Sequence, residues 1–251
     1  MQDSKLNNNL MINIVNIVWG YNCQTDKVQV LLVQNSLGPN ANRWGLPTTL
    51  LRANENAEEA SLRLVKEKMG IDLSNFNTEQ LATFSNIKRT ITGREIALTY
   101  MTYLPYLPEL TPGYGAKDVK WFEVDHNDQQ YLLKNQQLVL ETLNENINEN
   151  EFYNNIQKFN SENNLVSDHA LILRLAFKRI RNRLDYLPTI LLILGDNFTL
   201  KQARKVYAVF LKEPVEKIDN SNFRKTHGHL FSEVGIEHGK SGRPAKLYKL
   251  A

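Results

Sequence analysis

The stretch RWGLPTTLLRANENAEEASLRLVKEKMGI, residues 43–71, reads as a loop followed by an amphipathic helix. Its apolar residues recur at helical spacing over about residues 54–69, and Gly70 is the residue type expected just past a helix end. A loop and helix of this design can hold a metal ion when carboxylates gather on one helix face. The stretch therefore predicts the helix around which a domain is built, and it raises the question of which carboxylates that helix offers.

One face of the predicted helix carries Leu64, Glu67 and Lys68, which lie within about 100° of one another at 3.6 residues per turn. Three carboxylates there would hold Mg²⁺ and polarise an attacking water molecule. Leucine and lysine stand at two of the positions, and an ammonium group repels a divalent ion at short range. We therefore expect no catalytic residue and no metal site, with Glu67 the only remaining candidate ligand. In the simpler interpretation, Glu67 pairs with a neighbouring Lys or with Arg63.

The bulk composition is that of an ordinary globular protein. The chain has 251 residues, 42% of them hydrophobic and 23% charged, which predicts one large domain or two modest ones. Cys23 is the lone cysteine, so no internal disulfide forms and a reducing, cytoplasmic location is expected. No stretch is long and apolar enough to cross a bilayer and the amino end lacks a signal-peptide pattern, so no membrane partner is expected.

Charge is distributed unevenly along the chain. Residues 1–169 carry 14 Lys/Arg and 20 Asp/Glu, a net charge of −6, whereas residues 170–251 carry 16 Lys/Arg and 7 Asp/Glu, a net charge of +9. A basic final third on an acidic body is typical of a protein that binds a polyanion. The alternative interpretation is a basic surface that only meets solvent.

Secondary-structure patterns predict an α+β domain at the amino end. Five runs rich in β-branched and aromatic residues surround the predicted helix, at residues 13–22, 28–36, 78–86, 94–105 and 118–124. Residues 130–143 have helical spacing, and an Asn/Glu-rich connector follows at 144–164. The expected division is a domain over residues 1–126, an inserted helix and linker over 127–167, and a second domain over 168–251.

The second domain has the pattern of a winged helix-turn-helix. Thr199 can cap one helix and Asp219 a second, in which Phe223, Leu230 and Phe231 form the apolar stripe. Two short strands around a Gly-rich tip, HGKSGRP, follow. Amides, hydroxyls and cations on the outer face of the second helix would read base edges and phosphates, and the tip would contact the minor groove or backbone. The predicted DNA-binding residues are Ser221, Asn222, Arg224, Lys225, His229, Lys240 and Arg243.

Two features of this domain allow other interpretations. His227 falls on the inward stripe and is expected to be a packed histidine rather than a base reader. Winged-helix folds also mediate protein contacts, so a protein-interaction module is the alternative to DNA binding.

The amino-terminal stretch resembles a degraded Nudix box. Glu55, Arg63, Glu67 and Gly70 match that motif in register, as do the aliphatic Val65 and Ile71. The chain as a whole resembles the Nudix-related transcriptional regulators, which are typified by the ADP-ribose-sensing repressors of NAD metabolism. The resemblance is carried by this box followed in order by EQLATFSN, GREIALTY, KDVKWFEVD, FTLKQARKVYAVFL, NFRK and GRPAKLYKL. The resemblance implies a Nudix-like α/β/α sandwich domain followed by a C-terminal winged helix, in a homodimer on a palindromic double-stranded DNA operator.

The resemblance also implies a small effector, ADP-ribose or a related nucleotide, and no cofactor. Some relatives in this family sense sugars such as arabinose, so a sugar is an alternative effector. The rival function is a Nudix hydrolase that takes its acidic metal ligands from outside the box, for example from Glu79 or Glu95. Cations and aromatic faces in the loop and neighbouring strands suit a nucleotide, although core packing is the simpler reading of the aromatics. The predicted effector-binding residues are Arg43, Trp44, Thr48, Thr49, Phe84 and Arg94.

Overall fold

The structure is a computed structural model that describes residues 10–71, 77–90, 93–159, 164–237 and 244–251. Strand β1 (Met11–Asn22) lies in the interior of its main sheet. It pairs in parallel with β6 (Glu95–Tyr103) and antiparallel with β2 (Lys27–Asn35), within a mixed sheet of order β5-β6-β1-β2-β7-β8-β9. The remaining strands of this sheet are β3 (Trp44–Gly45), β4 (Thr48–Leu50), β5 (Asn77–Phe84), β7 (Ala116–His126), β8 (Tyr131–Asn135) and β9 (Leu138–Glu141).

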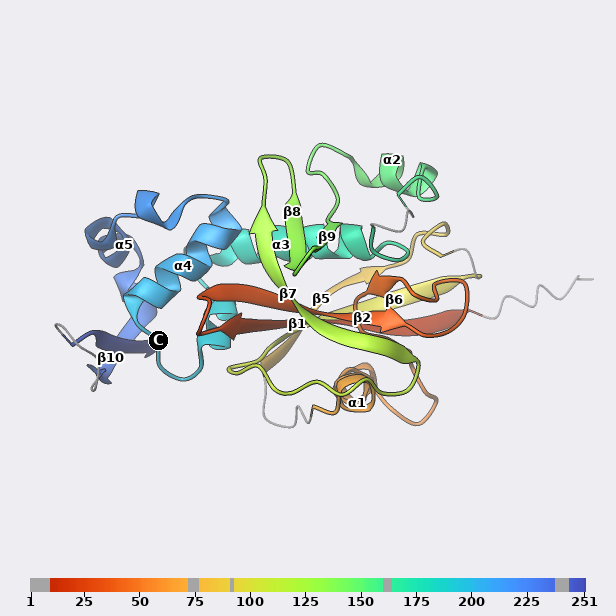
Figure 1. The fold of residues 1–251 in the computed structure, drawn as a ribbon, viewed down its shortest axis with the longest axis horizontal. Helices are drawn as coiled ribbons and strands as arrows, with labels where there is room; N and C mark the ends of the chain where they lie inside the picture. Colours follow the sequence, from red (N-terminus) through yellow and green to blue (C-terminus); the bar gives the residue numbers. More distant parts are fainter. Residues whose placement is uncertain (1–9, 72–76, 91–92, 160–163, 238–243) are drawn as a thin grey trace, which may run out of the picture.

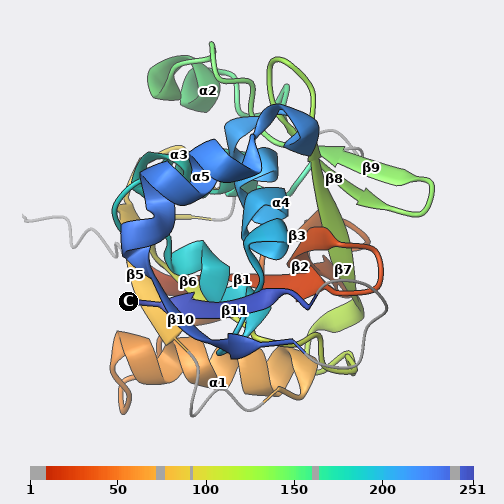
Figure 2. The same cartoon turned by 90° about the vertical axis from the view of Figure 1, so that its left-hand side faces the viewer.

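Both faces of this sheet are covered by helices. Along β1 the side chains alternate, so that Val15, Ile17 and Trp19 join the core beneath α3 (His169–Arg183), while Ile14 packs against α1 (Ala57–Met69) on the opposite face. The two helices lie on opposite sides of the sheet in both views (Figure 1, Figure 2). The expected α/β/α sandwich is confirmed.

Local sequence signals account for the bounds of α1. Asn56 accepts hydrogen bonds from the backbone N–H of Glu58 and Glu59, and the Glu59 carboxylate accepts one from the Asn56 N–H, which completes a capping box. Gly70 ends the helix in the left-handed conformation, with φ of 72°. The glycine predicted just past the helix end is confirmed.

The predicted helix over residues 130–143 is wrong. This segment forms β8 and β9, which join the edge of the main sheet, and Gln136 makes the turn between them with φ of 53°. Tyr131, Leu133 and Leu140 are buried in the core. Burial alternates with period 2 along β8, but in so short a run the apolar residues also fit helical spacing, which led to the wrong prediction. The short helix α2 (Glu149–Asn154) follows. The division of the chain at residues 126 and 167 stays a prediction.

The carboxy-terminal segment begins after α3. It contains the 3₁₀ turns η1 (Thr189–Leu194), η2 (Val215–Lys217) and η3 (Gly228–Leu230), the helices α4 (Leu200–Leu211) and α5 (Asn220–His227), and the antiparallel strands β10 (Phe231–Ile236) and β11 (Lys246–Leu250). Thr199 and Asp219 cap α4 and α5 as expected. The second helix is shorter than expected, because Phe231 lies in β10 rather than in the helical stripe.

The carboxy-terminal helices contact the sheet domain through defined bonds. The Tyr131 hydroxyl of β8 donates to the Phe210 carbonyl of α4 at 2.7 Å. Within the carboxy-terminal segment, the Tyr207 hydroxyl of α4 donates to the Leu184 carbonyl, directly after α3, at 2.6 Å. Lys205 of α4 forms an ion pair with Asp26 in the β1–β2 turn. Among the described residues, no helix has the length and apolar character that crossing a membrane requires.

Candidate functional site

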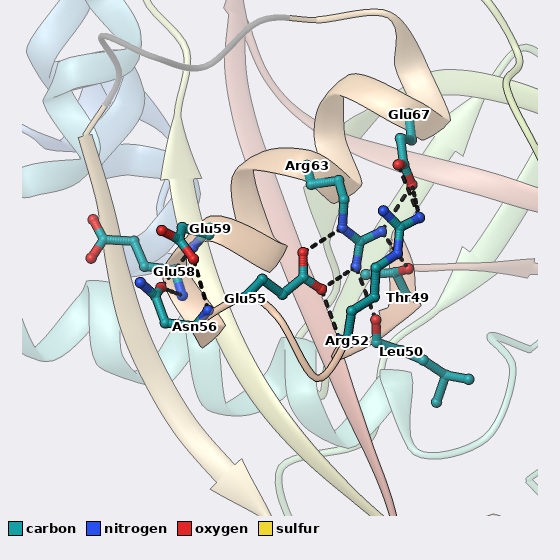
Figure 3. A network of polar contacts seen from close by, with 9 residues as sticks. All are labelled: Thr49, Leu50, Arg52, Glu55, Asn56, Glu58, Glu59, Arg63 and Glu67. Atoms are coloured by element: carbon teal, nitrogen blue, oxygen red, sulfur yellow. Dashed lines mark hydrogen bonds and ion pairs between the residues drawn. The ribbon is translucent and has the colours of Figure 1, made fainter.

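Arg63 organises the degraded box at the start of α1. Its guanidinium donates two hydrogen bonds to Glu55, at 2.7 and 2.6 Å, and one to Glu67 at 2.8 Å (Figure 3). It also donates to the Leu50 carbonyl at 2.9 Å and to the Thr49 hydroxyl at 3.3 Å. The arginine therefore ties the loop to the helix.

Glu67 is held by two cations. Besides Arg63, the Arg52 guanidinium donates to both Glu67 oxygens, at 3.1 and 3.3 Å. Burial acts to raise the pKa of Glu67, but Arg63 and Arg52 outweigh it and lower the pKa. The hydrogen bonds from Arg63 also lower the pKa of Glu55, to about 2. The pairing with Arg63 was one of the alternatives expected from the sequence, whereas Arg52 was missed.

The helix face that would hold a metal if it carried three carboxylates is divided between core and surface. Leu64 is fully buried among Ile14, Ala60 and Tyr100, so its side chain belongs to the packing between α1 and the sheet. Lys68 is half-buried at the other edge, and burial lowers the pKa of its ammonium group. Among the residues that the structure describes, no group of three His, Cys, Asp or Glu lies together as metal ligands would.

Four of the six predicted effector-binding residues serve the scaffold. Trp44 is buried and packs edge-on against Phe122, with ring centroids 5.1 Å apart. Phe84 is buried in the core on the α3 side of the sheet. Thr49 accepts a hydrogen bond from Arg63, and the Arg94 guanidinium donates to the carbonyl of Asn86 at 3.3 Å.

The other two, Arg43 and Thr48, lie around a pair of adjoining hollows beside the start of α3. The first, which we name the Glu95 hollow, has a volume of about 150 Å³ and is lined by Asn13, Asn35, Asn40, Leu46, Thr48, Arg89, Thr90, Glu95, Val166, Ser167 and His169. The second, which we name the Arg43 hollow, has a volume of about 270 Å³ and is lined by Pro39, Asn40, Arg43, Arg89, Thr90, Ile156, Gln157 and Ser167.

Arg89 is common to both hollows and belongs to a buried polar cluster that sequence reasoning missed. It donates to both carboxylate oxygens of Asp168, at 3.0 and 2.9 Å, and Asp168 accepts a further bond from the Tyr153 hydroxyl at 2.9 Å. Burial raises the pKa of Asp168, against the lowering effect of Arg89. The one local signal in the sequence was Asp168-His169 at the start of an apolar helix, and it did not separate this ion pair from an ordinary helix cap; in the structure Asp168 is the N-cap residue but its side chain makes no capping bond.

His169 links the cluster to the box loop. Its Nδ1 accepts a hydrogen bond from the Leu46 backbone N–H at 2.9 Å, which requires the neutral ring with its proton on Nε2. Burial, together with the positive charges of Arg89 and Arg43, lowers the pKa of His169 to about 3. The imidazole is therefore an uncharged acceptor at neutral pH.

The carboxy-terminal helices present the predicted polar face to solvent. Phe223 is buried against Tyr207, with ring centroids 4.9 Å apart, and His227 packs on both rings as expected. This packing turns the opposite face of α5 and the following turn outward. The exposed residues on that face include Ser221, Asn222, Arg224, Lys225 and His229.

A basic groove of about 540 Å³ adjoins this face, between α4, α5, the β10–β11 hairpin and the β1–β2 turn. Its cationic lining comes from Lys201, Lys205, Arg224 and Lys246, and Asp26 and Glu237 supply the acids. The predicted wing residues Lys240 and Arg243 lie outside the described residues. The two strands expected to carry the tip are present.

Comparison with known proteins agrees with both halves of the structure. Residues 14–142 match the family model for the NUDIX domain, and residues 190–250 match the model for the NrtR DNA-binding winged helix domain. The chain belongs to the Nudix family. It joins a Nudix domain to a winged helix of the NrtR type, which is the architecture of the Nudix-related transcriptional regulators that its motifs predict.

Individual relatives are similar to this chain over most of its length. A MutT/nudix family protein from Enterococcus faecalis is 30% identical, with 96% of this chain and 86% of that chain covered and a TM-score of 0.83. Shewanella oneidensis NrtR, solved with a 27mer DNA, is 23% identical, with coverage of 96% and 93% and a TM-score of 0.65. An Acinetobacter baylyi protein described as an ADPR responsive transcriptional repressor is 24% identical, with coverage of 90% and 76%.

Proposed function

We propose that this chain represses transcription by binding DNA through its winged helix, with α5 in the major groove. The observation that carries the proposal is the orientation of α5: Phe223 anchors one face of the helix in the core, and the other exposes Asn222, Arg224 and Lys225. Amides read adenine edges, and arginine reads guanine or phosphate. The basic groove that shares Arg224 extends the positive surface toward the hairpin.

The active form in this proposal is a homodimer on a palindromic operator. A single helix of eight residues reaches few base pairs, and two copies related by a two-fold axis place two such helices about one turn of DNA apart. Lys240 and Arg243 of each copy would contact the backbone beside the half-site. The protein acts in the cytoplasm, with no membrane partner and no cofactor.

The proposed effector is ADP-ribose or a related nucleotide, bound by the Nudix domain. The Acinetobacter baylyi relative is described as responsive to ADPR, and this chain retains a Nudix domain with polar hollows beside it. An effector that releases the operator must bind the DNA-incompetent arrangement of the dimer more tightly than the competent one. Arg43 and Thr48 are the predicted effector residues that line the hollows.

The Nudix domain in this proposal recognises its ligand without hydrolysing it. Leu64 is fully buried and Lys68 brings a cation, while Arg52 and Arg63 occupy the carboxylate of Glu67. A divalent ion on that carboxylate would stand beside the positive charges of Arg52 and Arg63, which repel it. A regulator gains nothing from destroying the molecule that it reports.

An electrophoretic mobility shift on the promoter region upstream of the chain's own gene, with and without ADP-ribose, tests the proposal. A shifted band that competitor DNA of scrambled sequence does not remove, and that ADP-ribose abolishes, is the expected result. A shifted band that ADP-ribose does not change would support DNA binding and would reject ADP-ribose as the effector. If the full chain shifts neither this promoter region nor any sequence selected from a randomised DNA library, the repressor proposal is wrong.

A further inference from the structure

A turn of the Nudix domain contributes an acidic side chain to the basic groove of the winged helix. The β1–β2 turn supplies Asp26 to the lining, and the Asp26 carboxylate forms an ion pair with Lys205 of α4. Burial acts to raise the pKa of Asp26, but the hydrogen bonds from Lys205 and Tyr21 outweigh it and lower the pKa. The groove therefore contains a carboxylate that is charged at neutral pH and lies on one of its lysines.

The Asp26 carboxylate is held in place from its own side of the groove. The hydroxyl of Tyr21, a side chain that is 2% exposed, donates to Asp26 Oδ1 at 2.9 Å, and Lys205 binds the other oxygen, Oδ2. Asp26 has φ of 57°, a left-handed conformation that aspartate tolerates better than most residues. The Asn22 side chain accepts hydrogen bonds from two backbone N–H groups of the same turn. The turn thus presents this carboxylate from a defined position.

The helix that carries Lys205 is also fixed to the sheet. Phe210 of α4 packs edge-on against Trp19 of β1, with ring centroids 5.9 Å apart, and its carbonyl accepts the Tyr131 hydroxyl. The turn and the helix therefore stay beside each other, and the part that can move is the Lys205 side chain. A lysine ammonium on its four-carbon stem can turn from one anion to another without a shift of the backbone.

The other cations of the groove are not held by the Nudix domain. Lys201 and Arg224 make no ion pair with another described residue, and Lys246 pairs with Glu233 of the neighbouring strand β10. Duplex DNA carries about one negative charge per 1.7 Å of its axis, so a strand that meets these cations also brings phosphates to Lys205. A phosphate and the Asp26 carboxylate would then compete for one ammonium group.

We propose that Asp26 is an internal competitor for DNA. In the free chain its carboxylate holds Lys205, and a DNA phosphate must displace it before this lysine joins the interface. After displacement the carboxylate, still held by Tyr21, lies near the phosphates and repels them. The turn thereby weakens the sequence-independent part of DNA binding, to which backbone charge contributes most. This inference rests on the proposed function for the identity of the polyanion.

The variant Asp26→Asn tests the competition. Asparagine accepts the left-handed conformation and the bond from the Tyr21 hydroxyl, but it offers Lys205 no charge. We expect about tenfold tighter binding of a labelled DNA duplex of unrelated sequence at low salt. The slope of log affinity against log salt should become steeper by about one unit, because one more lysine meets a phosphate. Fluorescence anisotropy of the full chain at several salt concentrations measures both quantities.

Two further variants separate release of Lys205 from a general gain of positive charge. Asp125→Asn makes the same charge change outside the groove, where it breaks the pair with Lys134, and should leave affinity and slope unaltered. The double variant Asp26→Asn/Lys205→Gln should return to the affinity and slope of the unaltered chain. If Asp26→Asn binds DNA no better than Asp125→Asn, or if its gain persists in the double variant, the inference is overturned.

Thermal unfolding reports whether Asp26→Asn folds normally. If its Tm falls, Tyr21→Phe replaces it: this variant frees the carboxylate from its anchor, and a smaller gain in the same direction is expected.

Titration calorimetry with inorganic tripolyphosphate separates the groove from the identity of the polyanion. Several-fold tighter binding of this probe by Asp26→Asn, with no DNA binding by any variant, would support the competition and reject the repressor proposal. DNA binding with no gain in Asp26→Asn for either probe would reject the competition alone. If neither probe binds any variant, both proposals are wrong.

Discussion

Arg89 and Asp168 form a buried bidentate ion pair across 79 residues of sequence, with nitrogen–oxygen distances of 3.0 and 2.9 Å. Their side chains are 2% and 0% exposed. Arg89 comes from the connection between β5 and β6, and Asp168 is the residue that precedes α3. The pair therefore fixes the first turn of α3 to the sheet at the point where both hollows meet.

Removing the negative partner of this pair should destabilise the fold strongly. We expect Asp168→Asn to lower the free energy of unfolding by about 3–5 kcal/mol, because a buried guanidinium loses its compensating charge. Urea denaturation measures the change. Asp125→Asn, which breaks an ion pair with Lys134 in which each side chain is 41% exposed, should cost less than about 1 kcal/mol. Equal losses of unfolding free energy in the two variants would mean that the buried pair stabilises the fold no more than the exposed pair does.

The neutral imidazole of His169 should make stability depend on pH. Its pKa is lowered from an ordinary 6.5 to about 3, by burial first and then by Arg89 and Arg43. The folded state therefore binds fewer protons than the unfolded state between these values, so this contribution is complete above pH 6.5 and is lost as pH falls toward 3. Between pH 6.5 and 5 the loss is about 2 kcal/mol.

A variant that keeps the acceptor without the titration tests this origin. His169→Gln should show a smaller difference between its free energies of unfolding at pH 7 and pH 5 than the unaltered chain does, because glutamine binds no proton in either state. Urea titrations at the two pH values give both differences. An undiminished difference in His169→Gln would assign the pH dependence to other groups.

The parts of the fold that sequence reasoning predicted correctly are those with local signals. Capping residues and Gly70 bound α1, and the apolar stripe of α4 and the cap of α5 place the two helices of the winged domain. The strands β8 and β9 were missed because a short run with buried residues at Tyr131, Leu133 and Leu140 fits both periods. Only pairing with β7 across the sheet decides between them.

The candidate site was harder to predict because its members come from distant segments. Arg43 and Thr48 lie near the recognisable motif, and Glu95 was named from the sequence only as a ligand of the rival hydrolase. Arg89 and His169 belong to no local pattern, and these residues meet only through the parallel pairing of β1 with β6 and the docking of α3. In the opposite direction, the helical wheel placed Leu64 beside Glu67. It could not distinguish the solvent face from the edge that the sheet buries.

The proposed recognition helix makes a prediction about salt. Arg224 is exposed on α5 and lines the basic groove, so Arg224→Ala should weaken operator binding about tenfold and reduce the slope of log affinity against log salt by about one unit. Fluorescence anisotropy at several salt concentrations measures both quantities. Lys134→Ala on β8, which lies outside the winged helix and does not line the basic groove, is the matched loss of charge. Unchanged affinity and slope in Arg224→Ala would remove this side chain from the interface.

The box on α1 should not support hydrolysis. Leu64 is buried in the core and Glu67 is paired with Arg52 and Arg63, so we expect this helix face to offer no open carboxylate to Mg²⁺. We expect AMP release from ADP-ribose with Mg²⁺ to be no faster in the unaltered chain than in Glu67→Gln, as measured by chromatography of the products. Activity that Glu67→Gln abolishes would restore the hydrolase function. Lys68→Glu tests the cation itself: even with this second carboxylate the expected rate stays at background, because the buried Leu64 still denies the metal its third ligand.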